Sequence, residues 1–212
     1  MDRQLEFYRL RGLEYGQLTG VNIAVHAMWD SFMLMHCGVG CKHKATSQLA
    51  THDWRENVVN RRGWTEVGDA ELIEGSADRI APYLRTWHER QSPGVMMVIS
   101  VTFLDLTGDD FRDACRQTAK GLSCPVLWVP APGYDGDMFS GYASATVEVI
   151  GSLDWSRPPT KPKSISILGY LFDRYEGDHQ GNLLQLRGLM KGLGLELGPI
   201  LFSGRPYEDL AE

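Results

Sequence analysis

Residues 95–101 read Val-Met-Met-Val-Ile-Ser-Val, an almost unbroken apolar run that follows a Ser-Pro-Gly turn signal at residues 92–94. A strand with one solvated face alternates apolar and polar residues, whereas a strand covered by helices on both faces is apolar throughout. This run therefore predicts a strand that is buried on both faces. Residues 125–130, Pro-Val-Leu-Trp-Val-Pro, predict a second strand of the same kind.

Helical patterns flank these two strands. Apolar residues at helical spacing predict a helix over residues 77–90, and the acidic pair Asp109-Asp110 predicts the start of another helix that runs to about Lys120. Because strands that alternate with helices of this length form parallel sheets, we expect segments 95–101 and 125–129 to pair in parallel. The sequence thus predicts a three-layer α/β fold with a Rossmann-like parallel sheet.

A proline-rich, charged stretch at residues 154–163 has the composition of a linker. It predicts a boundary between a Rossmann-like domain over residues 1–158 and an incomplete second α/β domain over residues 159–212. The second part carries a single strand–helix–strand unit, which is too small to cover a sheet on both faces. Its elements are expected at residues 164–171, 182–193 and 197–202.

Bulk composition restricts the class of protein. The chain has 212 residues, 43% of them hydrophobic, and a formal net charge of −6. Such a chain is globular, and its negative charge argues against general binding to nucleic acid or anionic membranes. No stretch reaches the roughly 18 apolar residues of a membrane-spanning helix, and the charged N-terminus has no signal-peptide core. Four cysteines without a dense framework suit a reducing compartment, so we expect a cytoplasmic protein.

The only cluster of soft metal ligands is the junction Cys37-Gly38-Val39-Gly40-Cys41, at the end of an apolar run. Cys41 is expected at the start of a helix, where backbone amides and nearby lysines stabilise a thiolate. The glycines let the backbone approach a bulky inorganic ligand. This composition favours an iron–sulfur cluster or another thiolate-bound cofactor, with Cys37 and Cys41 as metal ligands and Gly38 and Gly40 beside it.

A structural interpretation of these cysteines stays open. Three residues separate Cys37 from Cys41, and no second matched pair follows to complete a zinc site. Cys115 and Cys124 lie far apart in helix-like and strand-like contexts. In this interpretation Cys37 and Cys41 are buried, inert thiols. Two ligands also cannot close a four-ligand site, so any cluster needs ligands from elsewhere or from another chain.

Histidines and carboxylates near the junction allow two interpretations each. His36 and His43 flank the thiols; each would either bind or tune a metal site, or simply be packed in the core or solvated. Asp105, Asp109 and Asp110 would form a hard-metal or catalytic site, or cap the helix that follows. Capping explains Asp109 and Asp110 more simply.

Several short motifs occur in a recognisable order. They are His-Cys-Gly-Val-Gly-Cys at 36–41, Thr-Glu at 65–66 with Gly75 downstream, the segment 100–110 that ends in Gly-Asp-Asp, a restart at 164–169 and Phe-Ser-Gly at 202–204. Taken in order, they resemble the N-terminal portion of the nitrogenase component 1 type oxidoreductases. This family includes the catalytic subunits of nitrogenase and of the protochlorophyllide and chlorophyllide reductases.

The resemblance implies a fold, a cofactor and partners. In that family each subunit has several Rossmann-like domains, and two related subunits pair around an iron–sulfur cluster. The cluster here would be of the [4Fe-4S] type, shared with a partner chain and reduced by an ATP-dependent iron–sulfur reductase. Cys41 stands at the position of a family cluster cysteine. Tyr15-Gly16 and Thr102 stand where the family has cysteines, and Cys37 stands where it commonly has glycine, as a possible compensating ligand.

Two functions follow from the resemblance. The favoured one is a subunit or fragment of a nitrogenase-like oxidoreductase that relays electrons through a cluster at a subunit interface. The alternative is a non-catalytic module for cofactor assembly or interaction, which kept the fold and lost cluster ligands. In either case an incomplete sheet predicts pairing with itself or with a homologous component 1-like subunit, through the face that bears residues 36–44.

Overall fold

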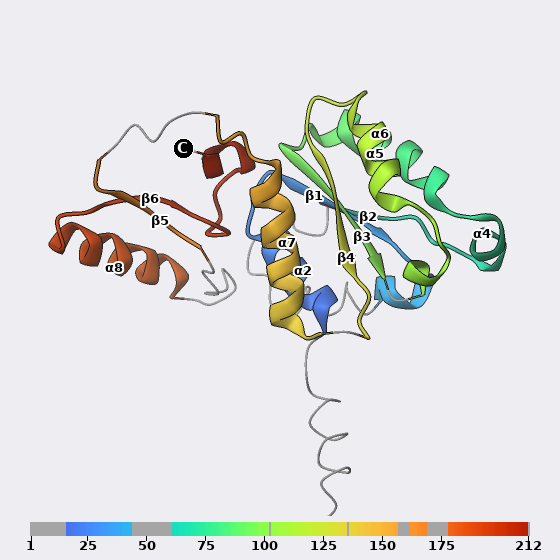
Figure 1. Ribbon diagram of the computed structural model, residues 1–212, viewed down its shortest axis with the longest axis horizontal. Helices are drawn as coiled ribbons and strands as arrows, with labels where there is room; N and C mark the ends of the chain where they lie inside the picture. The colour runs from blue at the N-terminus through green and yellow to red at the C-terminus, as the bar shows by residue number, and fades with distance from the viewer. Residues whose placement is uncertain are drawn as a thin grey trace, which may run out of the picture.

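The computed structural model describes residues 16–43, 61–101, 103–134, 136–156, 162–168 and 178–211. Its main sheet has four parallel strands in the order β2-β1-β3-β4 (Figure 1). These strands are β1 (Ser31–His36), β2 (Arg62–Trp64), β3 (Val95–Val101) and β4 (Val126–Ala131). Short helices occur in the connections: α4 (Asp69–Glu74), η2 (Ala77–Arg79) and η3 (Leu104–Leu106).

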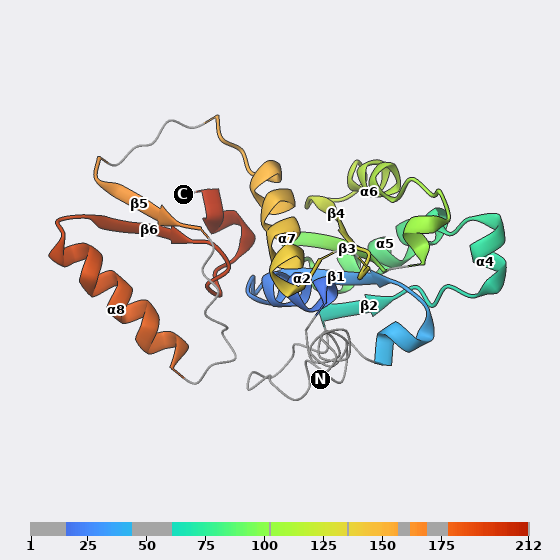
Figure 2. The same ribbon diagram turned by 60° about the horizontal axis from the view of Figure 1, so that its bottom comes forward.

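Helices cover both faces of this sheet. They are α2 (Gln17–His26) and α7 (Met138–Ser152) on one face, and α5 (Ile80–Gln91) and α6 (Phe111–Ala119) on the other (Figure 2). All seven side chains of β3 are buried, and they alternate between the two faces. Met97 and Ile99 pack in the core cluster of α2 and α7, while Met96 and Val98 pack in that of α5 and α6. The predicted three-layer α/β fold is confirmed.

The central strand pair also has the predicted geometry. β3 and β4 are adjacent and parallel, with the register running from Met96 opposite Val126 to Val101 opposite Ala131. The connection between them contains α6, so the two strands and the helix form one βαβ unit. Among the described residues, no helix is both long enough and apolar enough to cross a membrane.

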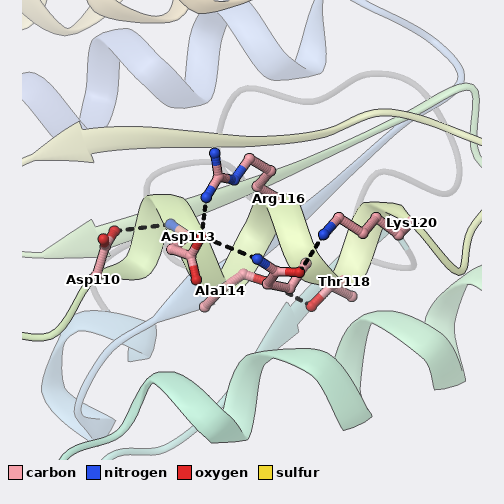
Figure 3. Close-up of polar contacts among 7 residues, drawn as sticks. Asp110, Asp113, Ala114, Arg116, Thr118 and Lys120 are labelled. Carbon is pink, nitrogen blue, oxygen red and sulfur yellow. Dashed lines mark hydrogen bonds and ion pairs between the residues drawn. The ribbon is translucent and has the colours of Figure 1, made fainter.

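Local polar contacts explain where α6 begins and which of its exposed side chains are linked by hydrogen bonds (Figure 3). Asp110 is the N-cap, and its carboxylate accepts a hydrogen bond of 2.8 Å from the backbone N–H of Asp113. Arg116 and Gln117 both donate to the Asp113 carboxylate one turn later, and Lys120 donates to Gln117. Acidic residues near a helix N-terminus and basic residues near its C-terminus also complement the helix dipole.

Helices α2 and α7 pack backbone against backbone. A Cβ atom added to Gly20 would lie 1.8 Å from the carbonyl oxygen of Met138, and one added to Gly141 would lie 2.0 Å from that of Gln17. Real Cβ atoms do not approach other atoms so closely, so the crossing requires glycine at both positions. The close approach brings Tyr142 of α7 into the core cluster that α2 covers.

A second sheet contains two parallel strands, β5 (Ser164–Ile167) and β6 (Glu196–Ile200), joined through α8 (His179–Gly192). Leu183 of α8 packs on Ile200 of β6. The strand–helix–strand order is the predicted one, although β6 begins one residue earlier than expected and residues 169–171 of the expected first strand lie outside the described residues. In both views α2 and α7 lie between the two sheets (Figures 1 and 2).

The segment after β6 packs against the first sheet's helices. Leu201, Phe202 and Leu210 belong to the core cluster of α2 and α7. The rings of Phe202 and Tyr142 meet edge to face, with centroids 5.3 Å apart. The backbone N–H of Tyr207, the first residue of η4 (Tyr207–Ala211), donates to Asp30 at 2.9 Å. The division at residue 158 stays a prediction, but the two parts share this core.

Candidate functional site

The candidate site lies at the carboxyl edge of the main sheet. β1 ends at His36, and residues 39–43 form a helical turn in which Cys41 is partly exposed. We call residues 37–43 the cysteine turn. Inside it, the backbone N–H of Cys41 donates to the carbonyl of Gly38 at 3.2 Å. The predicted helical position of Cys41 is confirmed.

The two predicted ligand cysteines differ in exposure, although both contact the core cluster of α2 and α7. Cys37 is fully buried and packs in the core cluster of α2 and α7. Burial disfavours the thiolate and, with the nearby Cys41, raises the pKa of Cys37 to about 12. A metal ligand must be reachable and deprotonated, and of the pair only Cys41 reaches the surface. The assignment of Cys37 as a ligand stays a prediction, and its burial weighs against it.

The glycines of the turn also differ. A Cβ atom on Gly38 would lie 3.3 Å from the ring of Phe103, so this part of the backbone rests on an aromatic side chain. A Cβ atom on Gly40 would meet nothing within 4 Å. Open space beside the backbone is therefore found at Gly40, next to Cys41.

Lys42, which follows Cys41, has charged and aromatic neighbours of its own. Its ammonium group forms an ion pair with Glu66 and lies 5.3 Å from the centroid of the Trp64 ring. Glu66 has a backbone φ of 52°, in the left-handed region that non-glycine residues seldom occupy. The ion pair joins the cysteine turn to the segment that follows β2.

His36, the last residue of β1, is fully buried and hydrogen-bonded through both ring nitrogens. Nδ1 lies 2.8 Å from the hydroxyl oxygen of Thr65, and Nε2 lies 2.8 Å from that of Ser76. The Ser76 hydroxyl donates to the Asp109 carboxylate at 3.0 Å, so its oxygen is left to accept from His36. Nε2 therefore carries the proton, and Nδ1 accepts from Thr65. We call Thr65, His36, Ser76 and Asp109 the His36 network.

Burial lowers the pKa of His36 to about 4, although the nearby Asp109 carboxylate opposes this effect. Because the unfolded chain binds the proton with the ordinary pKa of 6.5, folding is favoured fully only above that value. We expect the free energy of unfolding to fall by roughly 3 kcal/mol as the pH drops from 6.5 to 4. Urea unfolding at a series of pH values measures this loss.

Two variants separate His36 from the other titrating groups. His36→Gln removes the ring, so its unfolding free energy should depend less on pH between 4 and 6.5 than that of the unaltered protein. His88→Gln, at a half-buried position on α5, makes the same substitution outside the His36 network and is the matched control. Equal pH dependence in the two variants would contradict the role of His36.

The carboxylates predicted near the site have structural partners. Asp110 caps α6 as expected, but Asp109 instead accepts from both the backbone N–H and the hydroxyl of Ser76, and from the hydroxyl of Thr107. Asp105 accepts from Ser100 at 2.9 Å. Within the described ranges, no group of three or more His, Cys, Asp or Glu side chains is placed to hold a metal ion.

One of the remaining candidate residues, His43, belongs to the cysteine turn. Cys115 and Cys124 are buried free thiols, and His43 is exposed at the end of the cysteine turn. Gly16 is the N-cap of α2. Tyr15 and Thr102, which stand where the family has cysteines, lie outside the described residues.

These positions decide how well the site fits an iron–sulfur cluster. Such clusters are held chiefly by cysteine thiolates, usually four of them. The described residues offer one accessible thiol, that of Cys41, beside the open space at Gly40. The described residues can supply one ligand of a shared cluster, but they cannot supply a complete set of ligands.

Comparisons with known proteins agree with this fold. A family model described as nitrogenase component 1 type oxidoreductase matches residues 16–212. The nitrogenase iron-molybdenum cofactor biosynthesis protein NifE of Rhizobium meliloti (strain 1021) is 24% identical over 200 residues, which is 91% of this chain and 40% of the relative. The corresponding protein NifN of Rippkaea orientalis (strain PCC 8801 / RF-1) is 26% identical over 149 residues, 68% of this chain and 31% of the relative.

A solved structure, nitrogenase Cp1 at pH 5, has a TM-score of 0.72 and 17% sequence identity, covering 94% of this chain and 41% of that chain. At this identity the likeness shows the fold. The chain spans 40% of the length of the NifE relative. The family match, over residues 16–212, includes both sheets described above. Because the family match covers nearly the whole chain, this protein belongs to the nitrogenase component 1 type oxidoreductase family.

Proposed function

We propose that this chain is part of a component 1-type subunit that assembles a metal cofactor, and that it binds an iron–sulfur cluster as cargo rather than as a permanent electron relay. The observation that carries this proposal is the likeness to NifE over 91% of the chain, because that relative is named as a cofactor biosynthesis protein. The NifN relatives carry the same description.

The ligand set supports assembly over relay. A permanent relay cluster needs a closed set of thiolates that holds it through many turnovers. Of the two junction cysteines only Cys41 is accessible, and threonine occupies position 102, where the family has cysteine. A cluster held by few thiolates of this chain is easier to pass on, which suits cargo.

A partner subunit would supply the missing ligands. Large apolar side chains are exposed on the connections that leave the carboxyl edge of the main sheet, among them Val39 at 66%, Ile73 at 87% and Leu106 at 77%. Contiguous exposed apolar surface marks interaction sites, and we take these side chains as part of such a surface. We propose that a homologous component 1-type subunit, or a second copy of this chain, covers this edge beside Cys41.

A transfer experiment tests the proposal. The complex of this chain with its partner subunit is loaded with iron-57 and sulfide, repurified, and mixed with a component 1-type acceptor that lacks its cofactor. We expect the labelled iron to move to the acceptor. If the label instead stays bound and is repeatedly reduced by an ATP-dependent iron–sulfur reductase, the protein relays electrons and the assembly proposal is wrong. A complex that never binds the label contradicts both functions.

A further inference from the structure

Four segments that are distant in sequence meet directly behind the cysteine turn. His36 ends β1, Thr65 follows β2, Ser76 follows α4, and Asp109 precedes α6. The side chains of His36, Thr65 and Ser76 are all completely buried. The His36 network therefore joins the carboxyl end of β1 to the connections that leave β2 and β3.

Each bond of the His36 network has a fixed direction. Asp109 only accepts, so Ser76 donates to it and accepts from Nε2–H of His36. Nδ1 then has no proton, and Thr65 must donate to it. The Phe111 ring, with its centroid 4.9 Å from that of His36, closes the apolar side. With both nitrogens engaged, the imidazole cannot turn without leaving a buried polar atom unpaired.

Backbone hydrogen bonds from the segment after β2 also hold the end of β1 and the start of the cysteine turn. The N–H of Thr65 donates to the carbonyl of Met35 at 3.2 Å, and the N–H of Val67 donates to that of Cys37 at 2.9 Å. The pairing of β2 with β1 thus continues past the end of both strands to the first residue of the cysteine turn. Thr65 takes part twice, through its backbone to Met35 and through its hydroxyl to His36.

We propose that His36 is a positioning residue that fixes the direction in which the cysteine turn leaves β1, and that Thr65 and Ser76 are the partners through which it acts. His36 itself touches no cargo. The importance of this direction for the cluster rests on the proposed function, because Cys41 is the ligand that the turn presents. The positioning itself is a property of this chain alone.

The test compares Thr65→Val with Thr65→Ser. Valine has nearly the shape of threonine but cannot donate to His36, whereas serine keeps the hydroxyl. With valine, we expect the backbone amides of residues 39–43 to exchange hydrogen roughly tenfold faster, because one hydrogen bond to a buried group is lost. Alkylation of Cys41 by iodoacetamide should become faster in the same valine variant. Serine should restore both rates.

Ser76→Ala breaks the His36 network at a second point that does not adjoin the turn, so it should reproduce the effect of Thr65→Val. Asp110→Asn, which weakens only the α6 cap, is the matched control and should leave exchange in the turn unchanged. The proposal is wrong if exchange rises equally across the main sheet, or if valine and serine behave alike. These rates are measured without iron, so their outcome is independent of whether the cargo proposal holds.

Discussion

Replacing Cys41 with serine should remove the iron from the complex that this chain forms with its partner subunit. Cys41 is the accessible thiol of the cysteine turn, and an alkoxide replaces a thiolate poorly as an iron ligand. We expect iron and sulfide content to fall to background, together with the broad absorbance near about 400 nm that is typical of thiolate-bound clusters. The measurement is made on anaerobically purified complex, because a shared cluster needs ligands from both chains.

The other cysteines provide the controls. Cys115→Ser and Cys124→Ser alter buried thiols away from the site, and both variants should retain the iron of the unaltered complex. Cys37→Ser distinguishes the two interpretations of that residue: folded protein that loses iron identifies a ligand, and folded protein that keeps it identifies a core thiol. If the Cys41→Ser complex keeps its full iron content, Cys41 is not a ligand and the proposed cargo site lies elsewhere.

Gly20→Ala should be strongly destabilising although it adds only one methyl group. The new Cβ atom would lie 1.8 Å from the carbonyl oxygen of Met138 and 2.6 Å from the backbone nitrogen of Tyr142. These are backbone atoms, so no side-chain rotation relieves the overlap and the two helices must move apart. Overpacking typically costs about 1–3 kcal/mol, and a clash with backbone atoms belongs at the upper end of that range. Thermal and urea unfolding measure the loss.

Two further glycines on α7 show whether the cause is the helix crossing. Gly141→Ala makes the reciprocal clash with Gln17 and should destabilise the protein to a similar extent. Gly151→Ala lies on the same helix, but its Cβ atom would meet nothing within 4 Å. Because alanine has a higher helix propensity than glycine, this control should leave stability unchanged or raise it by about 0.5–1 kcal/mol. Equal losses at Gly20 and Gly151 would contradict the explanation.

The layered fold could be predicted because its signals are local. The apolar run that forms β3 and the N-cap of α6 at Asp110 can each be recognised within a few neighbouring residues. β2 and α4 carry no such signal. β2 has three residues, and α4 has six with no buried side chain, so neither is long enough to show a hydrophobic period.

The candidate site was predictable only in part for a different reason. The cysteine turn is contiguous, so its position at a helix start could be read directly. The burial of Cys37, which distinguishes it from Cys41, depends on α2 and α7, and α7 is distant in sequence. The His36 network combines Thr65 and Ser76 from the connection after β2 with Asp109 from the connection after β3, and an isolated threonine or serine gives no sign of a buried histidine partner.

The return of the segment after β6 to the first core has a mechanical consequence. Phe202 follows β6 by two residues, yet its ring packs on Tyr142 beneath the first sheet, and Gly204 donates to the backbone of Ala27 at 2.7 Å. A displacement of β6 must therefore either pull Phe202 out of that core or carry α7 with it. The two sheets are mechanically coupled through this shared core contact. A force applied to the second sheet is therefore transmitted to the helices that enclose Cys37.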